Sequence, residues 1–168
     1  MDRTKKNVAL LAACQGLLLS NNALLVATNG LAGFALATDK SLATMPVAAY
    51  VVGAALTTMP ASLLMRRIGR RMGFTIGACF CILGSLICAY AAYHREFALL
   101  CIGALILGAY NATGQYYRFA AADTASADFK SRAISLVLAG GIIGGFLGPE
   151  TSKLTKYAVA GAMFTGSY

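Results

Sequence analysis

The chain has 168 residues, of which 58% are hydrophobic and only 12% are charged. A soluble globular domain carries about 25% charged residues, and the mean hydropathy here is +0.69, so the composition excludes that class and indicates a membrane protein. The net charge is +8. It does not indicate nucleic-acid binding, because the positive residues cluster in short links between apolar runs instead of on one polar face.

Long uncharged runs alternate with short charged links along the whole chain. A helix needs roughly 20 residues to cross the hydrocarbon core of a bilayer. We therefore expect an all-α, polytopic transmembrane helical bundle with five complete spans and the start of a sixth. The expected spans are about 7–36, 42–65, 72–93, 97–117, 133–149 and an incomplete 157–168. Because the sixth run stops at Tyr168, we expect the chain to be a fragment of a longer protein or a truncated one.

Four arginines stand in the hexapeptide 66–71, between the second and third expected spans. An arginine at the bilayer centre costs at least about 3 kcal/mol, so this link must lie outside the membrane. If the N-terminus is cytoplasmic, the inner links carry ten Lys and Arg residues and the outer links carry four. This distribution satisfies the positive-inside rule. We predict a multi-pass protein of the plasma (cytoplasmic or inner) membrane with a cytoplasmic N-terminus.

Glycines recur at intervals of four in the fifth expected span, in two neighbouring rows. One row is Gly140, Gly144 and Gly148, the other is Gly141 and Gly145, and Pro149 follows immediately. Rows of bare backbone let another helix approach closely in lipid, so we predict that they form a helix-packing motif. Proline lacks a backbone donor, so we expect Pro149 to kink or end the helix.

Two of these segments resemble motifs of the major facilitator superfamily. Segment 144–149 resembles the GxxxGP motif of the family's fifth helix. Segment 62–71 resembles the family's signature between helices two and three, which consists of a glycine, three residues of any type and then Asp-Arg-x-Gly-Arg-Arg. The order and spacing of the two motifs also agree. The resemblance implies that residues 1–168 are most of the N-terminal six-helix half of a twelve-helix transporter.

The resemblance implies a cytoplasmic gate, but the chain departs from the pattern at two positions. Ser62 stands where the family has its first glycine, and Arg66 stands where it has an aspartate. We expect Asp123 or Asp128, in the link 118–132, to supply the missing negative charge. The expected gate residues are Arg66, Arg67, Gly69, Arg70, Arg71, Arg118, Asp123 and Arg132.

Two interpretations of the link 118–132 remain open. Arg118 and Arg132 bracket Asp123 and could pair with it near the membrane surface, where reduced hydration strengthens such bonds. The other interpretation is a solvated loop without a charge network. In the fourth span, Ala104 stands where the family often has an arginine four residues before a glycine, here Gly108. Proton-driven drug efflux of that type is therefore less supported.

Polar residues recur along one face of two expected spans. Since unpaired amides facing lipid are costly, we expect both stripes to face inward. They either line a solute cavity or form interhelical hydrogen bonds worth about 0.6 kcal/mol each. The stripes are Gln15, Asn22 and Asn29 in the first span, and Asn111 and Gln115 in the fourth.

We interpret the chain as part of a secondary active or facilitative transporter that moves a small-molecule solute by alternating access. Its expected partners are the lipid bilayer, the solute, and a missing C-terminal half or a second half-molecule. No cysteine or histidine spacing typical of a metal site and no catalytic set is evident, so we expect no enzyme, no metal and no cofactor. The alternative is a small multi-span scaffold or assembly protein whose glycine-rich helix binds partner helices.

Overall fold

The computed structural model describes residues 3–155 and Tyr168, and all regular elements in this part are helical. The expected all-α class is therefore confirmed. The elements are α1 (Arg3–Leu36), a 3-10 turn η1 (Lys40–Leu42), α2 (Met45–Ile68), α3 (Arg70–His94), α4 (Phe97–Gly114), α5 (Tyr117–Thr124), a 3-10 turn η2 (Ala127–Phe129) and α6 (Lys130–Thr155).

By length and composition, four segments within residues 3–155 are able to cross a membrane. They are Thr4–Leu36, Lys40–Ile68, Arg70–His94 and Phe97–Thr124. They correspond to the first four expected spans, and the polytopic bundle is confirmed. The fifth span stays a prediction, and the sixth, 157–168, lies outside the described residues except for Tyr168.

The helix ends differ from expectation in two places. The expected link 118–132 is mostly helical, because α5 begins directly after a short turn at Gln115 and Tyr116. Ala120, Ala121 and Ala122 of α5 are buried because the helix packs against α1 and α6, so the arginine at 118 does not end the helical path. At the other place, α6 continues to Thr155, so Pro149 does not end it.

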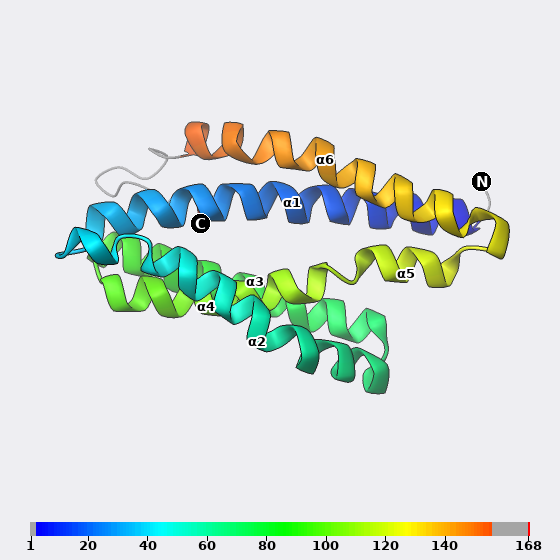
Figure 1. Ribbon diagram of the computed structural model, residues 1–168, viewed down its shortest axis with the longest axis horizontal. Coiled ribbons are helices and arrows are strands. Elements are labelled where there is room, and N and C mark those ends of the chain that lie inside the picture. Colours follow the sequence, from blue (N-terminus) through cyan, green and yellow to red (C-terminus); the bar gives the residue numbers. More distant parts are fainter. Residues whose placement is uncertain (1–2, 156–167) are drawn as a thin grey trace.

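The helices form two groups (Figure 1). α6 lies along α1, whereas α2 and α3 both pack on α4. α5 continues the path of α4 and contacts α1 and α6. As a result, α2 and α3 diverge from α5 at the end of the bundle that holds the N-terminus.

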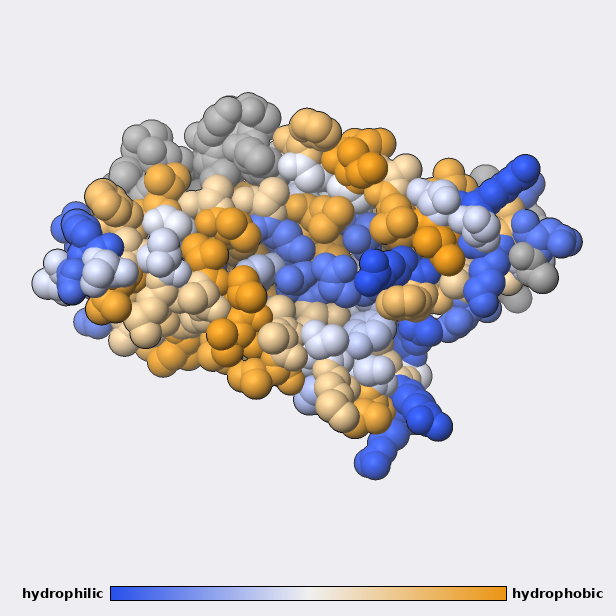
Figure 2. Space-filling model, viewed as in Figure 1, coloured by the Kyte–Doolittle hydropathy of each residue, from blue (hydrophilic) through white to orange (hydrophobic). Residues whose placement is uncertain are grey.

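The turns alternate between two ends of the bundle. The N-terminus, the α2–α3 turn and η2 lie at one end, while η1 and the α3–α4 turn lie at the other (Figure 1). Hydrophilic residues gather at both ends, and between them apolar surface lies on either side of a hydrophilic strip that runs along the middle of this face (Figure 2). We call the first end the arginine end, because the link 66–71 lies there.

Large apolar side chains cover the outside of the helices. Leu17, Met59 and Phe146 are 70%, 72% and 78% exposed. A water-soluble protein rarely exposes so many large apolar side chains. Inside, Leu25, Tyr50, Cys88, Leu100 and Leu107 belong to one buried cluster between the helices.

Two short turns depend on particular residues. Gly69 alone separates α2 from α3, with φ +85° and ψ 156°, a conformation that is almost restricted to glycine. Asp39 precedes η1 and accepts a 2.9 Å hydrogen bond from the Ser41 backbone N–H. This bond lowers the pKa of the Asp39 carboxyl below its ordinary value, because it stabilises the charged form.

Candidate functional site

A cluster of polar side chains joins the two expected stripes inside the bundle. Asn22 on α1 donates a 2.9 Å hydrogen bond to Asn111 Oδ1 on α4. Gln115 donates to the same oxygen at 3.2 Å, and the Tyr50 hydroxyl on α2 donates to Asn22 Oδ1. We call these four residues the asparagine cluster.

The asparagine cluster has hydrogen-bonding capacity left over. An asparagine side chain has two N–H donors and one acceptor oxygen, and glutamine is the same. Within the described residues, neither Asn111 Nδ2 nor Gln115 Oε1 has a hydrogen-bond partner, and neither is among the fully buried unpaired atoms. Both groups therefore have hydrogen-bonding capacity that the described residues do not use.

The rest of the α1 stripe is buried. Gln15 is 3% exposed and Asn29 is 0% exposed. Tyr168 donates a 2.7 Å hydrogen bond to Asn29 Oδ1, but Asn29 Nδ2 and Gln15 Oε1 have no partner in the described part of the chain. A buried polar atom without a hydrogen-bond partner destabilises the folded protein by about 1–3 kcal/mol. This penalty favours a polar environment along this face of α1.

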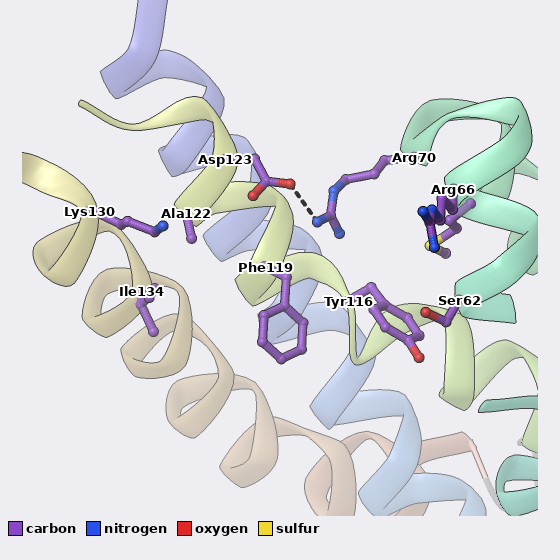
Figure 3. Close-up of a pocket in the computed structure, with 10 residues that line it drawn as sticks. Ser62, Arg66, Arg70, Tyr116, Phe119, Ala122, Asp123, Lys130 and Ile134 are labelled. Carbon is purple, nitrogen blue, oxygen red and sulfur yellow. Dashed lines mark ion pairs between the residues drawn. The ribbon is translucent and has the colours of Figure 1, made fainter. Parts of the chain in front are cut away.

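A second feature is a cleft of about 670 Å³ at the arginine end, between the α2–α3 turn and the α5–α6 connection (Figure 3). We call it the arginine cleft. Three cations and one carboxylate line it, together with aromatic and aliphatic side chains. The lining residues are Ser62, Met65, Arg66, Arg70, Tyr116, Phe119, Ala122, Asp123, Lys130 and Ile134.

An ion pair crosses the arginine cleft. Arg70 at the start of α3 bonds Asp123 on α5, and the two side chains are 35% and 56% exposed. Figure 3 shows that Arg66 and Lys130 lie on opposite sides of this pair in that view. The pair therefore connects the hexapeptide 66–71 to α5 through two residues that are 53 positions apart in the sequence.

The partner of Asp123 differs from the one considered in the sequence. Arg118 and Arg132 bracket Asp123 in the chain, but the carboxylate binds Arg70 instead. Arg118 places its guanidinium 4.9 Å from the Phe119 ring centroid, and its Nε is buried with no partner in the described residues. The reason is that Arg118 and Asp123 are both on helix α5, where a separation of five residues puts them on different faces.

The remaining expected gate residues do not line the arginine cleft. Arg67, Arg71 and Arg132 are exposed at the arginine end, and Asp128 is exposed in η2. Ser62 and Arg66, the two departures from the family pattern, do line it.

The glycine rows pack against α1, but only in part. A Cβ atom on Gly144 would overlap the Gly16 carbonyl oxygen, and one on Gly16 would lie 2.9 Å from the Gly140 carbonyl oxygen. A Cβ on Gly141 would meet the side chains of Leu19 and Gln15, while Gly145 has nothing within 4 Å. The structure describes Gly148 and Pro149 only as part of helix α6.

Among the polar residues of these two features, sequence reasoning missed Tyr50, Tyr116 and Lys130. Tyr50 belongs to the asparagine cluster, Tyr116 and Lys130 line the arginine cleft, and Tyr116 donates a 2.9 Å hydrogen bond to the Thr58 carbonyl oxygen. Each polar stripe belongs to a single helix, either α1 or α4, whereas Tyr50 lies on α2. Tyr50 is an isolated tyrosine in an apolar run, so only its position opposite α1 reveals its partner.

Long apolar helices that hold hydrogen-bonded amides between them define a multi-pass membrane protein with a polar interior. The chain belongs to the major facilitator superfamily, whose family profile matches residues 8–152. The motif resemblance is therefore confirmed.

Three curated relatives agree. The chain is 37% identical over 164 residues to the riboflavin transporter RfnT of Brucella anthropi, a match that covers 98% of this chain and 41% of that protein. Two uncharacterized MFS-type transporters of Bacillus subtilis, YddS and YdeG, are 31% and 32% identical over 112 and 115 residues. These matches cover 67% and 68% of this chain and 26% of each relative.

The chain thus spans less than half the length of these relatives. No solved structure matches it. The family and these relatives are membrane transporters and not enzymes, and the scaffold alternative is not favoured.

Proposed function

We propose that this chain is most of the N-terminal half of a transporter that moves a small, uncharged, polar solute across the plasma membrane by alternating access. Riboflavin is the leading candidate for the solute, because the riboflavin transporter RfnT matches 98% of the chain. The chain's N-terminus and its arginine end lie on the cytoplasmic side. A C-terminal half, or a second half-molecule, completes the path.

The asparagine cluster is the single observation that carries this proposal. It brings amides from α1 and α4 and a phenol from α2 to one place inside an apolar bundle. Its unpaired groups are one donor and one acceptor and carry no charge. A carboxylate or ammonium group of a solute would be left without a counter-ion among them.

Riboflavin fits this chemistry. Its ring system is uncharged at neutral pH and presents an edge of alternating carbonyl acceptors and an N–H donor, which an amide side chain complements. Its sugar-alcohol chain adds hydroxyl groups that bond amides and phenols equally well. The ring itself offers a large apolar face for the helix walls.

Transport can be tested with a two-part protein. The chain is co-expressed with the C-terminal part of RfnT that the match does not cover, and exchange of labelled riboflavin is measured in proteoliposomes, which is independent of direction. We expect exchange above that of either part alone. In parallel, riboflavin binding to the purified chain is followed by quenching of flavin fluorescence.

Variants connect the result to the cluster. We expect Asn111→Ala to weaken riboflavin binding by roughly 5- to 150-fold, because each lost hydrogen bond to a buried polar group costs about 1–3 kcal/mol. Asn7→Ala, an exposed asparagine on the same helix as Asn22, is the matched control and should bind normally. Equal binding by both variants, or no riboflavin binding by a folded chain, would contradict the proposal.

A further inference from the structure

We propose that an anionic phospholipid binds between α2 and α3 near the arginine link, with one acyl chain in an apolar pocket and its phosphate on Arg67. No residue of the asparagine cluster lines this pocket, so the site does not depend on which solute the protein moves. The shape of the pocket, its lining and the charge at its edge each support this assignment.

The pocket exists because α2 and α3 both pack on α4 and contact each other little. Only Gly69 separates the two helices along the chain, yet they leave a gap of about 280 Å³ between them. Leu64 on α2 and Phe80 on α3 line this gap and are each 38% exposed, and the buried Thr113 on α4 lines it from inside. We call the gap the α2–α3 pocket. It opens on the outer, apolar surface of the bundle.

The lining suits a hydrocarbon chain and not a polar ligand. In the described part of the chain, no charged residue lines the α2–α3 pocket. The Thr113 hydroxyl donates a 2.7 Å hydrogen bond to the Tyr110 carbonyl oxygen, so its proton is already used. The volume is just below the range of about 300–1,000 Å³ that sites for whole ligands have. An empty apolar gap loses van der Waals contacts, and one acyl chain restores them.

The edge of the α2–α3 pocket carries a free cation. Pro60, Leu64 and Arg67 follow one another at intervals of four and three residues, so they share one face of α2. Pro60 and Leu64 line the pocket, and Arg67 lies about one turn nearer the end of the helix at Ile68. Arg67 is exposed, and the described residues offer it no ion pair and no hydrogen bond. Its long side chain can therefore place the guanidinium at the level of the lipid headgroups.

The charge of the link determines which class of lipid fits. One guanidinium binds a phosphate through two parallel hydrogen bonds, so a single arginine is sufficient. Every phospholipid has this phosphate, but a zwitterionic headgroup also carries a cationic group, which the four arginines of segment 66–71 repel. An anionic headgroup has no such group. The site therefore prefers an anionic phospholipid to phosphatidylcholine.

Fluorescence quenching tests this site directly, because the chain contains no tryptophan. Phe80→Trp places a reporter in the α2–α3 pocket. Phe146→Trp is the matched control, since Phe146 is 78% exposed and does not line the pocket. Both variants of the full chain are placed in one mixture of phosphatidylcholine and phosphatidylglycerol. Only the component whose acyl chains are brominated changes, and bromine quenches tryptophan on contact.

We expect phosphatidylglycerol to be about fivefold preferred over phosphatidylcholine next to the tryptophan at position 80, the gain expected for one cation near an anionic lipid. The control at position 146 should show no preference. Equal quenching by the two lipids at position 80 would overturn the assignment, and so would no quenching there while position 146 is quenched. Loss of quenching at position 80 on co-expression with the C-terminal part of RfnT would assign the pocket to a helix of that part instead.

Two variants of equal charge test the role of Arg67 in the Phe80→Trp background. We expect Arg67→Gln to abolish the preference for phosphatidylglycerol. Arg71→Gln removes the same charge two residues before Gly73, which lines the pocket, and therefore from the opposite side of α3. It should keep the preference. An equal loss in both variants would show only general attraction to a basic surface and would overturn the contact with Arg67.

Discussion

At the scale of single residues, an ion pair connects the two helix groups at the arginine end. Arg70 and Asp123 are both partly exposed, so water weakens their attraction, and pairs of this kind are worth about 0.2–1 kcal/mol. The pair therefore contributes little to folding. Its consequence is positional, because it ties the α2–α3 turn to α5.

A double-mutant cycle measures this pair. We expect Arg70→Gln and Asp123→Asn to show a coupling of about 0.5 kcal/mol in thermal unfolding of the chain in detergent. A parallel cycle of Arg71→Gln with Asp123→Asn should show none, because Arg71 is exposed outside the cleft. Equal coupling in the two cycles would mean that Asp123 is attracted by the nearby arginines as a group and not by Arg70 in particular.

The turn at Gly69 also depends on a single residue. Its φ of +85° with ψ of 156° is outside the left-handed region that asparagine tolerates. We predict that Gly69→Ala and Gly69→Asn each destabilise the chain by about 1–3 kcal/mol. Space is not the cause, since nothing lies within 4 Å of a Cβ at this position. Chemical unfolding of the purified variants checks this, and a harmless Gly69→Asn would refute the backbone explanation.

At the scale of elements, the pairing of α1 and α6 is the clearest case of glycine-mediated packing. Gly16 on α1 and Gly144 on α6 bring the two backbones into direct contact. In lipid the hydrophobic effect does not drive helices together, so they associate through close packing of small residues such as glycine. The neighbouring row is less used, because Gly145 faces open space.

Matched substitutions test this packing. We expect Gly144→Ala to destabilise the chain by about 1–3 kcal/mol, because the added methyl meets a backbone carbonyl that cannot rotate away. Gly145→Ala should be neutral or slightly stabilising, since alanine favours a helix more than glycine does. The measurement is thermal unfolding in detergent. A similar loss of stability in both variants would exclude contact with Gly16 as the cause.

At the scale of the whole molecule, the alternation of turns defines an orientation test. The N-terminus, Gly69 and η2 lie at the arginine end, and Arg95 lies at the opposite end. With the arginine end in the cytoplasm, reporters fused after Gly69 and after Arg95 should lie on opposite sides of the membrane, the first inside. A reporter after Arg95 that is active in the cytoplasm, or one after Gly69 that is active outside, would reject this orientation.

Much of the architecture followed from charge alone. The runs expected at 7–36, 42–65 and 72–93 each largely coincide with one observed helix, α1, α2 or α3, because charged residues are costly in lipid and mark where helices leave it. The same rule gave a wrong prediction at Arg118, where a link was expected but the helical path continues as α5. A charge marks the membrane boundary less reliably when the helix packs against other helices on an apolar face.

The sequence predicted which side chains of a single helix belong to a candidate site, but not which side chains of other helices they meet. The sequence indicated that Asn22 and Asn111 face inward, since each belongs to a polar stripe on one helix. That they bond each other, and that Tyr50 joins them, depends on how α1, α2 and α4 pack. For the same reason the arginine cleft was not foreseen, because its cations come from three different helices.

The sequence by itself determined that this protein is a bundle of membrane-crossing helices, where its long apolar helices lie, and which family it resembles. These properties depend on local composition and on short motifs that residues carry wherever they are placed. Only the tertiary structure decided that Arg70 meets Asp123 and that Arg66 and Lys130 share one cavity. Those contacts join residues on separate helices, and it is the close approach of glycine-bearing helices that determines which side chains finally meet.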